Sequence, residues 1–222
     1  MEEINKFKVY SQGKGRLARL YTKSMLKNAS HFGEKIFKYK SEEYREIDPK
    51  RSKFAAAIIK GLSQTGIKPE SKILYLGASH GYTPSFVSDI VGENGVVFCL
   101  DFAPTVMRDL VLLCERRKNM IPLIADAKKP SSYKENIIPV DVVYQDIAQR
   151  EQVKIFVENC DLHLKDGGFG LLALKSRSVD VSEKPKRIFE LAKKELEKHL
   201  KIVDYRELDP YEKDHAFFVV KK

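Results

Sequence analysis

Short apolar runs and amphipathic segments alternate along most of this chain, beginning near residue 72. The runs have the length and character of strands, and we predict strands near residues 72–77, 96–101, 120–124, 139–146 and 168–175. The segments between them have helical periodicity, and we predict helices near residues 83–91, 104–117, 149–164 and 183–199. Strands that alternate with helices pair in parallel, so we expect a mostly parallel sheet covered by helices.

The end of the chain departs from this alternation. Residues 200–205 and 215–220 both have strand character, and the segment between them, around Asp209-Pro210, contains no helical pattern. Two strands joined in this way form an antiparallel hairpin, which we expect to close one edge of a seven-stranded sheet. This α/β arrangement resembles the Rossmann-like fold of S-adenosylmethionine-dependent methyltransferases more than that of nicotinamide dehydrogenases.

Residues 1–47 have a different pattern, in which basic and aromatic residues alternate in short runs. Turn-forming residues at 11–15 and 31–33 separate these runs. We therefore predict a small antiparallel β module over residues 1–47 and a second, larger domain over residues 48–222. At the boundary, Asp48 is expected to cap a helix and Pro49 to lie in its first turn, ahead of the first core strand.

A glycine-containing turn follows the first strand of the predicted sheet. Gly77 and Gly81 allow the backbone to turn tightly and to approach a ligand without a Cβ clash. Asp101 ends the next strand, at the carboxyl edge where open α/β sheets bind ligands and where an acidic group can accept hydrogen bonds from ribose hydroxyls. The pair of features predicts a ligand that contains an adenosine-type ribose.

The spacing of the glycines narrows the choice of ligand. Gly77 and Gly81 do not form the G-x-G-x-x-G of a dinucleotide site, and the chain has no G-x-x-x-x-G-K-[ST] phosphate loop. S-adenosylmethionine, which carries no phosphate, fits this turn better. Two alternatives stay open at this point, namely a turn that only joins a strand to a helix and the site of a nucleotide-dependent oxidoreductase.

Composition adds information on partners and compartment. The chain has 40 Lys and Arg against 31 Asp and Glu, a net charge of +9, which favours nucleic acid, although a lysine-rich solvated surface gives the same balance. Its three cysteines are widely spaced and lack C-x-x-C pairing, which predicts a reducing cytoplasm and no metal site. No apolar run reaches the ~18 residues of a membrane span and no secretory signal is visible, so we expect a soluble protein.

Several motifs resemble those of the fibrillarin family in its short archaeal-type form. They occur in the expected order, at residues 44–46, 48–49, 51–58, 75–78, 87–92, 146–149 and 209–216. The resemblance implies an S-adenosylmethionine-dependent RNA ribose 2′-O-methyltransferase that acts on rRNA, tRNA or both, as the catalytic subunit of a box C/D guide ribonucleoprotein. The implied partners are the guide and substrate RNAs, a Nop-family scaffold protein and a kink-turn-binding subunit that resembles a ribosomal protein. A non-catalytic structural subunit of such a particle is the alternative.

By the same resemblance, four residues form the catalytic set, namely Lys53, Asp146, Lys175 and His215. We predict Lys175 as the base, because burial and the neighbouring Lys53 ammonium would both lower its pKa. Asp146 is then expected to orient Lys175. His215 would position the ribose or share its proton, and Lys53 would steady the attacking oxygen or hold a phosphate.

The resemblance also assigns the cofactor site. The expected contacts are the backbone of the turn, Thr83 and Gln149 near the methionine part, Asp101 on the ribose, and residues around the adenine, giving the set Gly77, Ala78, Ser79, Thr83, Asp101, Phe102, Asp126, Ala127, Asp146 and Gln149. The chain departs from the family pattern at His80 and Tyr82, which are bulkier than usual, and at Asp101, where a longer Glu is common.

Overall fold

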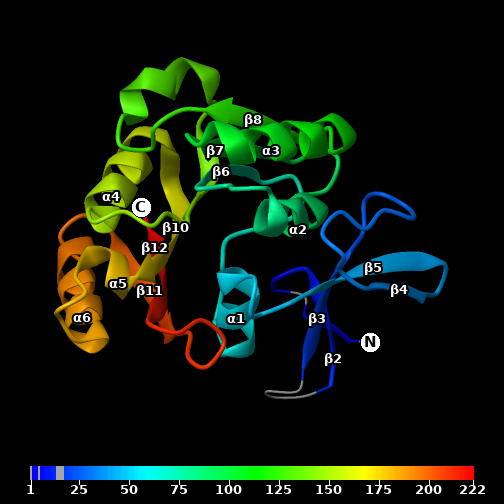
Figure 1. The fold of residues 1–222 in the computed structure, drawn as a ribbon, viewed down its shortest axis with the longest axis horizontal. Coiled ribbons are helices and arrows are strands. Elements are labelled where there is room, and N and C mark those ends of the chain that lie inside the picture. Colours follow the sequence, from blue (N-terminus) through cyan, green and yellow to red (C-terminus); the bar gives the residue numbers. More distant parts are fainter. Residues whose placement is uncertain (1, 5, 14–17) are drawn as a thin grey trace.

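A seven-stranded sheet forms the centre of the protein in a computed structural model that describes residues 2–4, 6–13 and 18–222 (Figure 1). Its strand order is β11-β12-β10-β9-β6-β7-β8. The strands are β6 (Lys72–Leu76), β7 (Val96–Asp101), β8 (Met120–Ile124), β9 (Val140–Gln145), β10 (Leu164–Lys175), β11 (Lys201–Glu207) and β12 (His215–Lys221). All neighbouring pairs from β10 to β8 are parallel, whereas β12 runs antiparallel between β10 and β11. The predicted fold class and the terminal hairpin are confirmed.

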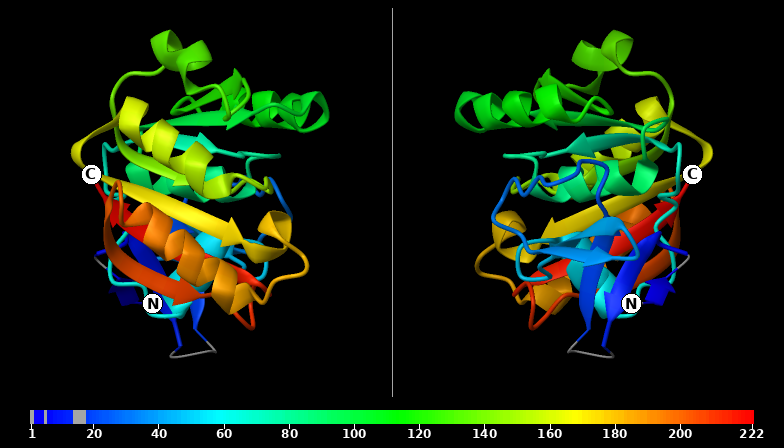
Figure 2. Two further views of the ribbon diagram at one scale, coloured as in Figure 1. Left: turned by 90° about the vertical axis from the view of Figure 1, so that its left-hand side faces the viewer. Right: turned by 90° about the vertical axis from the view of Figure 1, so that its right-hand side faces the viewer.

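Helices lie on both faces of this sheet (Figure 2). They are α1 (Lys53–Ile59), α2 (Tyr82–Val91), α3 (Pro104–Arg116), the 3-10 helix η2 (Pro130–Asn136), α4 (Gln152–His163), α5 (Ser176–Val179) and α6 (Pro185–Leu196). The short α5 and η2 are additions to the predicted elements. Within the described part of the chain, no helix has the length and apolar character that crossing a membrane requires.

The first core strand shows why both faces are covered. Ile73 and Tyr75 belong to the hydrophobic cluster that includes residues of α1, α2 and α3, while Leu74 and Leu76 belong to the cluster that includes residues of α4 and α6. Successive side chains of a strand point to opposite faces, so a continuous apolar run is stable only where both faces are buried. β6 therefore lies in the middle of the molecule, with the turn that follows it at the carboxyl edge of the sheet.

The N-terminal residues form a separate antiparallel sheet in the order β1-β2-β3-β5-β4. Its strands are β1 (Glu2–Ile4), β2 (Val9–Gln12), β3 (Arg19–Lys23), β4 (Ile36–Tyr39) and β5 (Glu42–Ile47). Residues 14 and 15 of the predicted turn lie outside the described residues. Phe7, Leu20 and Ile47 share one hydrophobic cluster with residues of α1 and α2. The two sheets are thus packed together, and the division at residue 47 stays a prediction about domains.

The start of α1 differs from the prediction. Ser52, not Asp48, is the N-cap of this helix, and its hydroxyl accepts a hydrogen bond from the backbone N–H of Ala55 at 3.4 Å. The carboxylate of Asp48 instead accepts from the backbone N–H of Lys50 at 2.8 Å, in a turn that precedes the helix. Asp and Ser can both cap a helix. Asp48 stabilises the preceding turn and Ser52 caps the helix, so the helix begins at Lys53.

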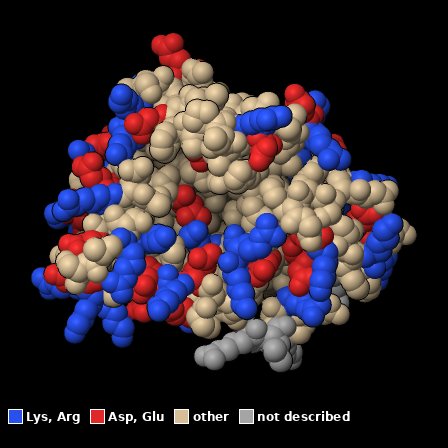
Figure 3. All heavy atoms as spheres, in the orientation of Figure 1, with Lys and Arg blue, Asp and Glu red and all other residues tan. Residues whose placement is uncertain are grey.

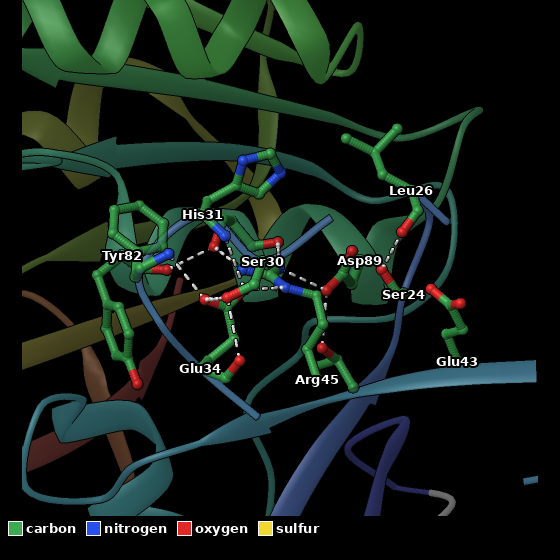
Figure 4. A network of polar contacts seen from close by, with 12 residues as sticks. Ser24, Leu26, Ser30, His31, Glu34, Glu43, Arg45, Tyr82 and Asp89 are labelled. Carbon is green, nitrogen blue, oxygen red and sulfur yellow. Dashed lines mark hydrogen bonds and ion pairs between the residues drawn. The ribbon is translucent and has the colours of Figure 1, made fainter. Parts of the chain in front are cut away.

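Buried charges join the N-terminal sheet to α2, as Figure 4 shows for Glu34, Arg45 and Asp89, and to Arg117, which follows α3. The Arg45 guanidinium pairs with Glu34 at 2.7 Å and with Asp89 at 2.8 Å, and Arg117 pairs with the other oxygen of Asp89 at 2.8 Å. Each of these side chains is at most 1% exposed. Thr22 adds a hydrogen bond to Asp89 at 2.7 Å. Two positive and two negative charges are therefore balanced away from water, which is the condition under which charges are tolerated in a core.

Candidate active site

The turn after β6 is shaped by its contact with the neighbouring strands. Gly77 has φ +83°, and a Cβ there would lie 2.3 Å from the backbone oxygen of Asp146. The backbone N–H groups of Gly77 and Ala78 both donate to the carbonyl of Leu100, at 2.9 and 3.0 Å. Only glycine combines this backbone conformation with so close an approach. The turn therefore lies directly against the ends of β7 and β9.

Asp101, the last residue of β7, holds this turn in place. One of its carboxylate oxygens accepts from the backbone N–H of Ser79 at 2.8 Å and the other accepts from the backbone N–H of Ala103 at 3.1 Å. A carboxylate has about four lone-pair positions, so both oxygens can still accept a hydrogen bond from a ligand. Asp101 thus has a structural role, and its free lone pairs are compatible with ribose binding, which stays a prediction.

A cavity of about 300 Å³ opens beside Asp101. Eight of the ten predicted cofactor residues line it, namely Gly77, Ser79, Asp101, Phe102, Asp126, Ala127, Asp146 and Gln149. Phe102 lines this cavity and is 60% exposed, so its ring is available to cover a flat ligand. The predicted residues thus come together from four separate loops at the carboxyl edge of the sheet.

A second cavity, of about 630 Å³, lies on the other side of the turn. The remaining two predicted cofactor residues, Ala78 and Thr83, line it together with Lys53. Gly77, Ser79 and Asp146 line both cavities, so the turn and the Asp146 carboxylate stand between them. On this face of the molecule, Figure 3 shows a hollow near the centre that contains an acidic group and has Lys and Arg side chains around it.

Lys53 and Asp146 form an ion pair at this junction. Their Nζ and Oδ2 atoms are 3.1 Å apart, and the two side chains are 20% and 22% exposed. Burial lowers the pKa of Lys53, but the carboxylates of Asp146 and Glu212 more than offset this effect, so the pKa is raised above its ordinary value. Lys53 is therefore a fixed positive charge at neutral pH.

His215 and Lys175 lie opposite each other where β12 begins and β10 ends. The Nδ1 of His215 is 2.7 Å from the carbonyl oxygen of Lys213, which can only accept, so Nδ1 carries the proton and Nε2 has the lone pair. Burial, followed by the positive charges of Lys53 and Lys175, lowers the pKa of His215 below its ordinary value. Lys175 itself is exposed, which differs from the buried environment that our prediction of it as the base assumed.

Glu212 is a member of this cluster that the sequence analysis did not single out. Its carboxylate lies 4.0 Å from Nδ1 of His215, and its side chain is 17% exposed. Burial raises the pKa of Glu212, with Lys53 acting in the opposite direction. The available signal in the sequence was its position three residues before His215, in the segment that leads into the last strand.

Comparison with known proteins establishes the family. The sequence matches the Fibrillarin family model over residues 2–222. The chain belongs to the fibrillarin family. A relative from Thermococcus onnurineus, named fibrillarin-like rRNA/tRNA 2′-O-methyltransferase, is 45% identical over 92% of this chain and 90% of its own length.

Two solved fibrillarin structures are similar over almost the whole chain. One is Aeropyrum pernix fibrillarin in complex with natively bound S-adenosyl-L-methionine, with a TM-score of 0.86 and 39% identity over 96% of this chain and 97% of that one. The other is a fibrillarin/Nop5p complex, with a TM-score of 0.88 and 38% identity over 100% of both chains. The fold of this chain is thus that of fibrillarin.

Proposed function

We propose that this chain is an S-adenosylmethionine-dependent RNA ribose 2′-O-methyltransferase. The observation that carries the proposal is the arrangement around Asp146. There the cavity of about 300 Å³, lined by predicted cofactor residues, meets a second cavity that contains the Lys53–Asp146 ion pair. A methyl donor in the first cavity and a ribose in the second would meet at this point. The name of the Thermococcus onnurineus relative and the S-adenosyl-L-methionine bound to the Aeropyrum pernix protein support the same reaction.

The residues present fit the cofactor. Asp101 would accept hydrogen bonds from the ribose hydroxyls, Phe102 would cover the adenine, and Asp126 and Ala127 would border its edge. The close approach that Gly77 permits would bring the turn against the methionine part. When bound, S-adenosylmethionine supplies a methyl group on a positively charged sulfur, which makes that carbon open to attack by an oxygen.

The chemistry requires removal of the ribose 2′-hydroxyl proton as the oxygen forms its bond to the methyl carbon and the carbon–sulfur bond breaks. His215 is the residue best suited to take this proton, because its Nε2 carries a lone pair and its low pKa keeps it neutral. Glu212, 4.0 Å from Nδ1, would stabilise the imidazolium that results. The Lys53 ammonium, fixed by Asp146, would stabilise the developing negative charge on the oxygen.

The role of Lys175 changes accordingly. Its side chain is exposed and it is paired in register with His215, so it would be accessible to the incoming RNA. Binding of the RNA would bury it, which is the environment that our first prediction of it as the base assumed. Lys175 is the second candidate for the base, and the pH dependence of the reaction separates the two.

Within this proposal the chain works as the catalytic subunit of a box C/D guide particle on rRNA, tRNA or both. The fibrillarin/Nop5p complex supports a Nop-family scaffold as its partner, and a kink-turn-binding subunit and the guide RNA complete the particle. The net charge of +9 agrees with RNA partners. The three free cysteines, all buried, agree with a place in the reducing cytoplasm.

The test is methyl transfer by the reconstituted particle, together with calorimetric titration of the chain with S-adenosylmethionine and NAD. We expect saturable binding of S-adenosylmethionine only, and transfer to one ribose hydroxyl of the substrate RNA. Asp146→Asn should abolish transfer, while the exposed control Glu135→Gln should not change it. Efficient transfer by Asp146→Asn would refute the site, and a particle that assembles but never methylates would favour the non-catalytic alternative.

A further inference from the structure

The larger cavity extends well beyond the catalytic pair. At about 630 Å³ it has twice the volume of the cavity beside Asp101, and its outer part is formed by three separate segments. The loop before β4 contributes His31 and Phe32. The segment before α1 contributes Arg51, and the end of α3 contributes Arg116. The N-terminal sheet therefore contributes part of the wall of the candidate active site.

Two contacts hold the exposed side chain of Arg51 in this wall. The carbon of its guanidinium lies 4.1 Å from the centre of the Tyr82 ring, and its Nη1 donates to the carbonyl of Phe32 at 3.2 Å. Tyr82 is itself fixed, because its hydroxyl accepts from the backbone N–H of Asp48 at 3.2 Å and its ring packs edge-on against Phe32 at 5.3 Å. A guanidinium has five N–H donors, so most of those on Arg51 stay available in a fixed orientation.

Arg116 adds a second guanidinium to the wall. Among the residues that the structure describes, neither it nor Arg51 has a carboxylate within ion-pair distance. The two acidic groups of the cavity are already engaged, Asp146 by Lys53 at 3.1 Å and Asp109 by Nδ1 of His80 at 2.9 Å. With Arg51, Lys53 and Arg116 against Asp109 and Asp146, the cavity lining has a net charge of +1 when His80 is neutral, which favours an anionic ligand.

We propose that Arg51 and Arg116 bind the phosphodiester backbone of the substrate RNA beside the target ribose. The inference rests on the proposed function, which requires a ribose hydroxyl to reach the Lys53–Asp146 pair. The phosphates on either side of that nucleotide are bonded to the same ribose, so they must lie in the space next to it. Guanidinium groups match phosphate oxygens in charge and geometry, and the outer cavity presents two of them.

This assignment gives the N-terminal sheet a part in substrate binding. Phe32 accepts the hydrogen bond that orients Arg51, and His31 lies on the same wall as Arg116. Contacts to the phosphates carry no sequence information, so they position the strand while guide pairing selects the nucleotide. The expected effect of losing them is weaker binding of the substrate that depends less on salt, with no change in which ribose is modified.

The test compares Arg116→Gln and Arg51→Gln with Arg108→Gln in particles assembled with guide RNA and scaffold protein. Arg108 is an exposed arginine on the same helix as Arg116 and does not line the cavity. We expect the KM for substrate RNA to rise about tenfold in each cavity variant, and the slope of log affinity against log salt to fall by about one per lost phosphate contact. The KM for S-adenosylmethionine and the behaviour of Arg108→Gln should stay as in the unaltered particle.

Three results would overturn the proposal. Both cavity variants could match Arg108→Gln in KM and in salt slope. Arg51→Gln could raise the KM for S-adenosylmethionine and not that for RNA, which would make the cofactor carboxylate its ligand. Arg116→Gln could weaken particle assembly and leave RNA binding unchanged, which would indicate a protein contact. If the unaltered particle transfers no methyl group, the proposed function fails. The affinity of the same particles for substrate RNA, compared between the cavity variants and Arg108→Gln, would still test this inference.

Discussion

Replacing Glu34 with Gln tests the buried charge network and its dependence on pH. Burial by itself raises the pKa of Glu34, but Arg45 and the backbone N–H of Phe32 more than offset this, so the pKa falls from 4.5 to about 2. A carboxyl whose pKa is lower in the folded state stabilises the protein above pH 4.5, and this stability is lost as the pH falls towards 2. At 1.4 kcal/mol per pH unit, the contribution is about 3 kcal/mol.

The assay is the free energy of unfolding, measured by guanidinium denaturation of both proteins between pH 7 and pH 3. We expect Glu34→Gln to be less stable by about 3 kcal/mol at pH 7, with the difference shrinking steadily below pH 4.5. Glu135→Gln, at an exposed position, is the matched control and should change stability by less than about 0.5 kcal/mol. A difference that stays constant with pH, or that is below about 1 kcal/mol at pH 7, would refute the reasoning.

Other predictions concern the site. Gly77→Ala should abolish S-adenosylmethionine binding in calorimetry, because its Cβ would lie 2.3 Å from the backbone oxygen of Asp146; retained affinity would contradict the close approach. Asp101→Ala should weaken that binding at least tenfold, since the turn and the ribose both lose an acceptor, and an unchanged Kd would remove its assigned role. If His215 is the base, kcat/KM should decline with acid only below pH 6.5, whereas a midpoint above this value would favour Lys175. Glu212→Gln should reduce kcat about tenfold and move that decline to lower pH, while a loss of stability without either effect would indicate a structural role.

The secondary structure around the sheet could be predicted because local pattern decides it. The apolar run that became β6 is buried on both faces, and a short continuous apolar run is typical of such a central strand. The end of α6 was predicted three residues too late and its start two residues too early, since amphipathic patterns fade gradually at helix ends. Asp48 was expected to be the cap in place of Ser52, because the sequence offers two capping residues and only packing selects one.

The candidate site was predictable only in part. Residues that follow strands were found, because parallel strands bring their carboxyl ends to one edge. The environment of each residue was not predictable, and Lys175 proved exposed while Lys53 proved paired with Asp146. Glu212 was not identified because its role depends on the path of the loop before β12, and no periodicity encodes that path.

The buried charge network between the two sheets, which is the joint between them, also restricts which substitutions this chain can accept. Its four charges are two acids and two arginines with no access to water, so any single replacement of one by a neutral residue leaves a net charge in the core. Effects of substitutions at Arg45, Glu34, Asp89 and Arg117 should therefore be strongly non-additive. A version of this joint with an apolar interior can be reached only by changing acids and arginines together. Sequence drift one residue at a time should leave it nearly untouched, even while the exposed surface around it is replaced.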